Sequence, residues 1–321
     1  MLHYCSLNDV HLQNVWLTIG SFDGVHKGHQ AIIRKLTTRA HTAGDPAVVL
    51  TFHPHPSIIL RKRYSHYYLT SPEERALLLG EMGVDVVITH PFDLQLANLT
   101  AREFVQELVL HLGLHHLCTG HDFALGRGRE GDLPTLQKLG KEFGFSLNFI
   151  RRIRVAGQVV SSSRIRSALE LGDIEMVSRL LGRPYQVSGE VVRGDGRGHR
   201  LGIPTANLEV WAERALPRPG VYACLVDVDG IMWKAVVNVG FRPTFSADKP
   251  GDGMSGIHHP TYNQPVSPLV EAHLLEFERD LYRQQISLSF VARLRDEQRF
   301  SDVQALVNQV QQDIKRARKI L

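Results

Sequence analysis

The chain has 321 residues, with 43% hydrophobic and 22% charged side chains, a globular composition that excludes a disordered or fibrous protein. At about 150 residues per domain, this length predicts two domains. The 37 basic and 33 acidic residues give a net charge of +4, and the basic residues are scattered, so no nucleic-acid partner is expected. The small positive excess suits small anionic ligands such as nucleotides.

Cysteine content and the absence of apolar segments predict the cellular compartment. Cys5, Cys118 and Cys224 form no CxxC pair, which argues against a disulfide framework or a structural zinc site. The first residues lack the basic and apolar segments of a signal peptide. No apolar run approaches the ~20 residues that cross a bilayer. We therefore expect a cytoplasmic protein without a membrane partner.

In the first half of the chain, short apolar strands alternate with amphipathic helices. Strands are expected at 15–20, 47–52, 84–88 and 116–119, and helices at 28–43, from 71 onward and at 101–112. Ser71, Pro72 and Glu74 form the pattern of a capping box in front of an apolar run. This alternation predicts a Rossmann-like α/β domain, with a parallel sheet and a ligand crevice at the carboxyl ends of its strands.

After about residue 185 the strands follow one another without helices. They are expected at 186–192, 221–228, 232–239, 269–276 and 286–291. The segment 246–268 is rich in Gly, Pro, Asp and His and predicts a long loop, and an apolar stripe after Ser301 predicts a last helix. We expect an antiparallel β-barrel with a C-terminal helix, and we place the two domains at 1–183 and 184–321.

A histidine pair follows the first strand on a glycine-rich turn. His26 and His29 are separated by Gly28 at the start of a helix, where backbone N–H groups and imidazoles can converge on a phosphate. A zinc pair is an alternative, but no third ligand stands at a recognisable spacing. Two solvated histidines are the other alternative. At this place in a βαβ unit, the HxGH pattern resembles the signature of nucleotidyltransferases.

A second anion-binding pattern opens another helix at 161–166, with the sequence SSSRIR. Hydroxyls and arginines at a helix start can hold a polyphosphate. The alternative is an ordinary N-cap with a basic first turn. Because that charge placement is unfavourable for the helix dipole unless an anion is bound, we favour the phosphate site. The loop 120–132 lies between the two patterns, and its composition alone does not separate a ligand loop from a flexible basic one.

The second domain opens with a glycine-rich loop at 194–202, followed by Pro-Thr-Ala-Asn at 204–207. Such a loop can wrap phosphates, although most glycine-rich loops are only turns. The Thr205 hydroxyl and the Asn207 amide oxygen are hard ligands suited to Mg²⁺. Glu271 lies on an alternating strand, and its pattern alone favours a surface carboxylate.

Taken together, these motifs resemble the bacterial bifunctional riboflavin kinase/FAD synthetase family in order and spacing. The resemblance covers nearly the whole chain and rests on 20–29, 52–56, 120–132, 161–166, 181–185, 194–207, 219–222, 238–245, 271–277 and 294–300. It implies an FMN adenylyltransferase (nucleotidyltransferase) domain that converts FMN and ATP into FAD and pyrophosphate with magnesium. It also implies a riboflavin kinase domain that uses Mg–ATP to convert riboflavin into FMN.

The resemblance assigns roles to individual residues of this sequence. His26 and His29 would stabilise the reacting phosphates, and Glu271 would be the base for the riboflavin hydroxyl. Flavin would be bound by Asp122, Phe123 and Arg295, and the metal by Thr205 and Asn207. The implied nucleotide-binding residues are Gly20, Phe22, Asp23, Gly24, Ser162, Ser163, Arg166, Gly194, Gly198, Gly202 and Pro204.

Four residues depart from the family pattern: His53, His199, Ile203 and Arg283. A neutral imidazole at 199 holds phosphate less firmly than arginine, which predicts weaker or more pH-dependent ATP binding by the kinase. These departures leave open a single-function FAD synthetase whose second domain is a flavin-binding or regulatory module. A nucleotidyltransferase with another phosphorylated acceptor is a further alternative, because HxGH alone would permit it.

Overall fold

The computed structural model describes residues 1–61, 67–120, 123–150, 153–194, 198, 201–241 and 268–321. Packing divides the chain into two compact units. The first unit holds Met1–Ile165 and Leu180–Gly182, and the second holds Arg166–Arg179 and Arg183–Leu321. The helical residues between Arg166 and Arg179 therefore pack with the second unit, although they precede its continuous part in the chain.

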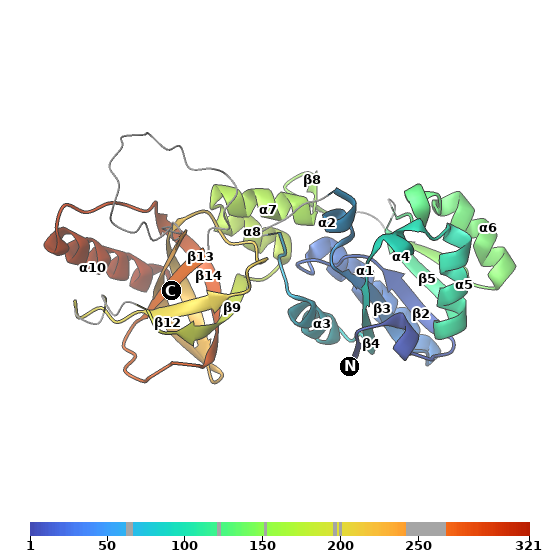
Figure 1. The fold of residues 1–321 in the computed structure, drawn as a ribbon, viewed down its shortest axis with the longest axis horizontal. Coiled ribbons are helices and arrows are strands. Elements are labelled where there is room, and N and C mark those ends of the chain that lie inside the picture. Colours follow the sequence, from blue (N-terminus) through green and yellow to red (C-terminus); the bar gives the residue numbers. More distant parts are fainter. Residues whose placement is uncertain (62–66, 121–122, 151–152, 195–197, 199–200, 242–267) are drawn as a thin grey trace, which may run out of the picture. The chain divides into compact units, whose positions relative to one another are not determined.

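The first unit is built on a six-stranded parallel sheet, drawn in blue and green in Figure 1. The strand order is β1-β4-β3-β2-β5-β6, and every neighbouring pair is parallel. In chain order the strands are β1 Leu2–Tyr4, β2 Val15–Ile19, β3 Ala47–His53, β4 Val86–Pro91, β5 Leu114–Gly120 and β6 Ser146–Ile150. The predicted parallel α/β sheet is confirmed.

Helices connect these strands and continue beyond them. They are η1 Leu7–Asp9, α1 Lys27–Ala43, α2 Pro56–Arg61, α3 Pro72–Gly80, α4 Leu94–Asn98, α5 Ala101–Leu112, η2 Arg127–Arg129, α6 Leu133–Phe143, α7 Ser162–Leu171 and α8 Ile174–Leu181, with a small hairpin of β7 Arg154–Val155 and β8 Gln158–Val159 before α7. The predicted capping box of α3 is present. The Ser71 hydroxyl accepts from Glu74 N (3.1 Å), and the Glu74 carboxylate accepts from Ser71 N (3.0 Å).

Both faces of the parallel sheet are buried, because successive residues of a strand point to opposite faces. On β3, Leu50 belongs to a core that includes Leu108 of α5. Its neighbour Val49 belongs to a second core with Ile33 of α1 and Leu79 of α3. Helices on both faces leave the carboxyl ends of the strands free to carry loops.

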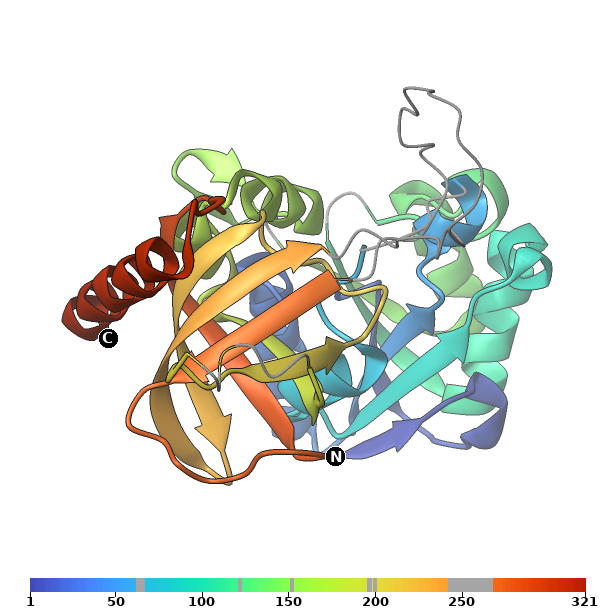
Figure 2. The same ribbon diagram turned by 60° about the vertical axis from the view of Figure 1, so that its left-hand side comes forward.

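The second unit is a closed antiparallel barrel with the strand order β10-β13-β12-β11-β14-β9 (Figure 2). Its elements are β9 Tyr185–Val192, β10 Ala206–Val210, β11 Gly220–Val228, β12 Ile231–Phe241, β13 Pro268–Leu274, β14 Gln285–Arg295 and α10 Val303–Ile320. Ile314 and Ala317 of α10 pack on the outside of the barrel against Val221, Ala223 and Val236. The predicted barrel and C-terminal helix are confirmed.

Several elements were not predicted from the sequence. β1 has three residues, two of them exposed, and β10 follows directly on the glycine-rich loop, so neither shows a periodic pattern.

Arg283, which stands where the family has glycine, adopts a left-handed backbone with φ 64°. This conformation explains why glycine is suited to that position. The predicted loop at 246–268 and His199 lie outside the described residues, apart from Pro268 at the start of β13.

Candidate active sites

The first site lies where the strand order of the parallel sheet reverses. β2 pairs with β3 on one side and with β5 on the other, and the chain proceeds outward from β2 in both directions. Ligands of open α/β sheets bind at the carboxyl ends of strands at such a reversal. The turn after β2, from Gly20 to His26, occupies this place.

This turn has an unusual backbone. Phe22 (φ 46°), Gly24 (φ 81°) and Val25 (φ 39°) all have positive φ angles, and for a β-branched residue such as Val25 this conformation is strained. The fully buried Asp23 anchors the turn, because its Oδ1 accepts from Leu69 N (2.9 Å) and Thr70 N (3.1 Å). Strain of this kind persists only where the surroundings hold it, as is common at functional sites.

His26 and His29 lie together at the start of α1. His26 is the N-cap, and its Nδ1 accepts from His29 N (3.2 Å), so its proton is assigned to Nε2. The two imidazole rings are stacked with centroids 3.6 Å apart, and the Phe22 ring meets His29 edge-on at 5.0 Å. A Cβ at Gly28 would press on the His26 ring, so glycine is needed there. The pair predicted from the sequence is therefore assembled.

His29 is neutral at physiological pH. Burial lowers its pKa well below the usual value, and the nearby His26 and Arg75 lower it further. Its Nδ1 is buried without a hydrogen-bond partner among the described residues. In the described part of the chain, no group of three or more His, Cys, Asp and Glu residues could hold a metal ion. The zinc interpretation of this pair thus gains no support.

The second predicted phosphate motif meets the same turn. The Ser162 hydroxyl donates to the Asp23 carbonyl (2.9 Å), which places the start of α7 beside the turn after β2. Ser161 caps the helix by accepting from Arg164 N (3.3 Å). Ser163 is exposed in the first turn, and Arg166 follows three residues later on the same helix. The hydroxyls and the histidine pair are thus brought together.

The loop after β5 carries two of the predicted flavin-binding residues. Asp122 lies outside the described residues. Phe123 is partly buried and packs against the core on the α5 side of the sheet. Glu130 fixes the loop, because its Oε1 accepts from Ala101 N at the start of α5 (2.8 Å). A flavin contact by Asp122 and Phe123 stays a prediction.

The second site is a row of polar side chains on the outer face of the barrel. Strand register places Glu271 of β13 opposite both Asn207 of β10 and Asn238 of β12. Their sequence neighbours, such as Val239 and Ala272, are fully buried on the other face. Directly opposed residues have Cβ atoms about 4.5–5.5 Å apart, so the three polar side chains adjoin.

Asn207 has the features of a ligand residue. Its Oδ1 is buried and accepts no hydrogen bond from any described residue. Gly194 lies so close to the Asn207 amide that a Cβ there would collide with it. Thr205 lies two residues earlier, so its hydroxyl is expected on the same face of the strand, and it is exposed. A buried oxygen without a donor and a nearby hydroxyl fit a hard cation such as Mg²⁺.

The described residues of the glycine-rich loop, Gly194, Gly198 and 201–202, lie close to this pair or to the residues just before it. Ile203 N donates to the Gly198 carbonyl (2.9 Å), and a Cβ at Gly198 would collide with the Ile203 carbonyl. Gly202 has a left-handed backbone with φ 70°. His273 of β13 holds the Pro204 carbonyl through its Nδ1 (2.7 Å). The end of the loop is thus held by two strands, through its continuation into β10 and the hydrogen bond from His273 of β13.

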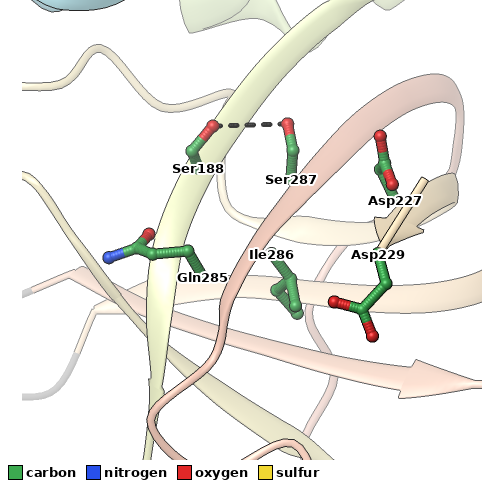
Figure 3. A pocket seen from close by; sticks show the side chains of 6 residues that line it. All are labelled: Ser188, Asp227, Asp229, Gln285, Ile286 and Ser287. Atoms are coloured by element: carbon green, nitrogen blue, oxygen red, sulfur yellow. Dashed lines mark hydrogen bonds between the residues drawn. The ribbon is translucent and has the colours of Figure 1, made fainter.

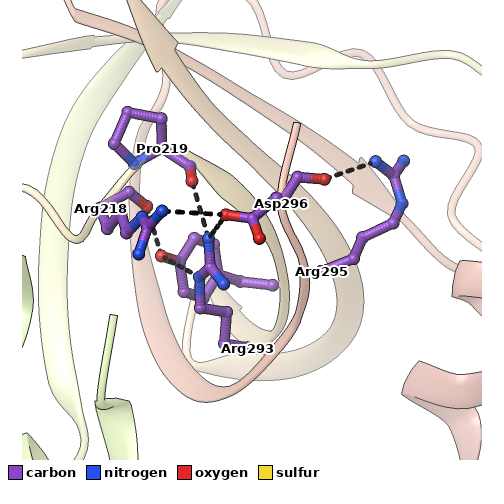
Figure 4. A network of polar contacts seen from close by, with 6 residues as sticks. Arg218, Pro219, Arg293, Arg295 and Asp296 are labelled. Carbon is purple, nitrogen blue, oxygen red and sulfur yellow. Dashed lines mark hydrogen bonds and ion pairs between the residues drawn. The ribbon is translucent and has the colours of Figure 1, made fainter. Parts of the chain in front are cut away.

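Arg295 makes contacts that the sequence did not predict. Its guanidinium forms an ion pair with the buried Asp313 of α10 (2.8 Å). Figure 4 shows that it also donates to the Asp296 carbonyl (2.9 Å). Arg293 binds the Asp296 carboxylate (2.6 Å) in the same network. These contacts fix the segment that follows β14. A direct contact of Arg295 with flavin stays a prediction.

The segment after β14 also reaches the polar row. The Glu297 carboxylate lies so close to Gly240 of β12 that a Cβ there would lie 2.5 Å from Glu297 Oε1. Gly240 is two residues from Asn238, on the same face of the strand. Glu297 therefore lies on the face of β12 that carries Asn238, two residues further along the strand.

Comparison with known proteins assigns each half of the chain to a family. Residues 9–164 match the FAD synthetase family, and residues 181–321 match the riboflavin kinase family. A bifunctional riboflavin kinase/FMN adenylyltransferase of Pseudomonas fluorescens is 38% identical over 94% of this chain and 92% of its own length. The chain belongs to the bifunctional riboflavin kinase/FMN adenylyltransferase family. It is a riboflavin kinase and an FMN adenylyltransferase.

Other relatives agree with this assignment. The Escherichia coli (strain K12) protein of the same name is 36% identical over 94% of this chain and 91% of its own length. The Bacillus subtilis protein is 31% identical over 92% of this chain and 89% of its own length. A solved Streptococcus pneumoniae chain, described as a macrolide-efflux protein, is 27% identical with a TM-score of 0.84. The two chains align over 99% of this one and 98% of that one.

The riboflavin kinase half also has an open cavity of about 250 Å³ that is not the polar row (Figure 3). It is lined by Ser188, Asp227, Asp229, Gln285, Ile286 and Ser287. Asp227 pairs with Met232, which is six residues from Asn238 on β12, a separation of about 20 Å along a strand.

Among the described helices none is both long and apolar enough to cross a bilayer.

Sequence reasoning missed two residues of these sites. Asn238 lies in the segment 238–245 on which the resemblance rests but was given no role, because only the strand register places it beside Glu271. Arg75 of α3 is fully buried beneath the turn after β2, donating to the Ser21 carbonyl (2.7 Å). The sequence offered one signal for Arg75. A basic residue in the first turn of a capped helix is unfavourable for the helix dipole, which suggests a function other than helix stability.

Proposed function

We propose that each reaction is carried out by the residues gathered in one half of the chain. Domain 1–183 would transfer AMP from ATP to FMN, and domain 184–321 would phosphorylate riboflavin with ATP. The histidine pair on the reversal point of the parallel sheet supports the first assignment. The opposed Asn207 and Glu271 on the barrel support the second and carry the proposal. We also propose that its partners are these small molecules in the cytoplasm, with no nucleic acid or membrane.

In adenylyl transfer, an oxygen of the FMN phosphate attacks the α-phosphorus of ATP and pyrophosphate leaves. His26 Nδ1 accepts from His29 N, which assigns the ring proton to Nε2, and this N–H would donate to a phosphate oxygen. His29 and the Ser163 hydroxyl would add neutral donors, and Arg166 would add a positive charge for the triphosphate. Ser162 would add its backbone N–H at the helix start, because its hydroxyl already donates to the Asp23 carbonyl. No covalent enzyme intermediate is needed, since positioning and electrostatic stabilisation lower the barrier.

In the kinase half, Glu271 would accept the proton of the riboflavin 5′-hydroxyl as its oxygen attacks the γ-phosphorus of ATP. A general base must lie within hydrogen-bond reach of that hydroxyl. Asn238, which stands opposite Glu271, would orient its carboxylate. The loop of Gly194, Gly198 and Gly202 would surround the phosphates with backbone N–H groups.

Mg²⁺ would be held by Thr205 and Asn207. The buried, unpaired Oδ1 of Asn207 supports this assignment, because a cation ligand satisfies an oxygen that otherwise costs about 1–3 kcal/mol. When bound, Mg²⁺ neutralises charge on the ATP phosphates. The chain's own contribution is to hold the two oxygens in place, through the His273–Pro204 hydrogen bond and the strand pairing of Asn207.

The variant Glu271→Gln tests the kinase assignment. It removes the base but keeps the shape of the side chain, so we expect riboflavin phosphorylation to be lost while supplied FMN is still converted to FAD. Liquid chromatography of the products measures both. Glu209→Gln is a matched control, because Glu209 is exposed on β10, two residues from Asn207. Phosphorylation at the wild-type rate by Glu271→Gln would show that Glu271 is not the base.

A further inference from the structure

Arg75 is an arginine in the interior of the adenylyltransferase half. It has no exposed surface, although it lies in the first turn of α3. Its Nη1 donates to the Ser21 carbonyl (2.7 Å), to Thr51 Oγ1 (2.8 Å) and, more weakly, to the Phe52 carbonyl (3.4 Å). One guanidinium nitrogen thus joins the turn after β2 to the end of β3.

The rest of the guanidinium is not satisfied within the described part of the chain. Nε and Nη2 are buried there without a hydrogen-bond partner. Leaving donors of a charged group unpaired in the interior is costly. Nearby negative charge comes from Asp23 and Glu73, but Asp23 Oδ1 is engaged with Leu69 and Thr70. An apolar residue would fill this space without that cost, so packing alone does not account for an arginine here.

Both anchor points of Arg75 belong to the active site. Ser21 lies directly before Phe22, whose ring contacts His29, and before Asp23, whose carbonyl accepts from Ser162. Thr51 Oγ1 also donates to the Ser21 carbonyl (3.0 Å), so Ser21 is held from two sides. The strained turn of Phe22 to Val25 needs such support from outside itself.

We propose that Arg75 is a positioning residue for adenylyl transfer, which fixes the turn after β2 against β3 and acts on His29 through its permanent charge. This inference rests on the proposed role of the histidine pair. Arg75 does not touch the reacting atoms in this account. It determines where the turn holds Phe22 and Asp23, and its charge adds to the effects of burial and of His26 that favour the neutral form of His29.

The electrostatic part of the proposal has a definite sign. The groups that act on His29 are His26 at the same helix start and Arg75 from α3, and the uncharged Phe22 ring packs against it. A positive neighbour disfavours a second positive charge, so Arg75 lowers the pKa of His29. Removing the guanidinium charge must therefore raise that pKa and allow His29 to protonate at a higher pH.

Three variants of the full-length protein test the proposal. Arg75→Met removes the charge and the hydrogen bonds, Arg75→Lys keeps the charge but loses the planar fork, and Ser71→Ala removes only the cap of α3. Ser71→Ala is the matched control, because it weakens the same helix without touching Ser21. For each, the rates of FMN adenylylation and riboflavin phosphorylation are measured, together with the pH titration of the His29 ring by NMR.

We expect Arg75→Met to lower kcat for adenylylation on the order of 100-fold, the size of effect caused by a 1 Å misplacement. Phosphorylation should be unchanged, and His29 should titrate at a higher pH. Arg75→Lys should leave the His29 titration unchanged but still lose activity. Wild-type adenylylation by Arg75→Met, or an equal loss in Ser71→Ala with an unchanged His29 titration, would overturn the proposal. If the wild type adenylylates no FMN, the proposed function fails. The His29 titrations of the wild type and Arg75→Met would then still show whether Arg75 lowers the pKa of His29.

Discussion

Asn207 shows how a residue can weaken a fold and serve a ligand. Its buried Oδ1 has no donor among the described residues, a defect that proteins rarely keep without a use. It stands opposite Glu271, where β10 pairs with β13 and His273 of β13 holds the Pro204 carbonyl. The cost and the location together favour a ligand residue over a structural one.

The substitution Gly194→Ala tests whether Asn207 is a ligand residue, because it adds a single methyl group beside the Asn207 amide. The new Cβ would collide with the Asn207 amide and force it out of place. We expect kinase activity to fall and the Mg²⁺ concentration needed for half-maximal phosphorylation to rise. FMN adenylylation by the same protein is the internal control. An unchanged Mg²⁺ requirement would show that the position of Asn207 does not matter for the metal.

Single residues differed in how far the sequence could predict them. His26 and His29 are three residues apart, so local helix geometry alone brings them together. Glu271 looked like a surface carboxylate, because its partners Asn207 and Asn238 are distant in sequence and only strand register joins them. Arg75 could not be assigned for the same reason, since its contacts with Ser21 and Thr51 depend on the packing of α3.

Among the elements, α10 and β14 are joined by a buried charge pair. The Arg295 and Asp313 side chains are 13% and 1% exposed and lie 2.8 Å apart. Removing one partner of such a pair leaves an uncompensated buried charge. Because Arg295 also holds Asp296, the pair connects the packing of α10 with the segment that carries Glu297.

We expect Asp313→Ala to lower the free energy of unfolding of the barrel by about 3–5 kcal/mol and to reduce riboflavin phosphorylation. Urea denaturation measures the first effect. Glu276→Gln is the matched control, because it breaks the exposed Arg318–Glu276 pair on the same helix, and exposed pairs contribute about 0–1 kcal/mol. Equal losses in the two variants would contradict a special role for the buried pair.

Elements with a clear period were predictable, and those without one were not. α1 and α5 begin and end within about a residue of their predicted bounds, and α3 begins directly after its predicted cap, because caps and apolar periodicity agree there. β10 holds the proposed metal ligand Asn207 and directly follows the other, Thr205. Its five residues come after a loop and show no distinctive pattern. Tertiary pairing with β9 and β13 makes it a strand.

At the scale of the whole molecule, two separate cores support two activities. The sheet of the first unit and the barrel of the second each bury their own apolar side chains. Apart from Arg166, which packs with the second unit, the residues proposed for adenylylation and for phosphorylation belong to different units. The activities should therefore be separable by single substitutions, and a loss in one half should leave the other working.

The most direct test follows the products formed from riboflavin, ATP and Mg²⁺ by liquid chromatography, for the wild type and for His29→Asn. The account predicts FMN followed by FAD for the wild type. For His29→Asn it predicts FMN that accumulates with little FAD. Riboflavin left untouched by the wild type, while supplied FMN becomes FAD, would contradict the assignment of a kinase to the barrel. It would leave a single-function FAD synthetase.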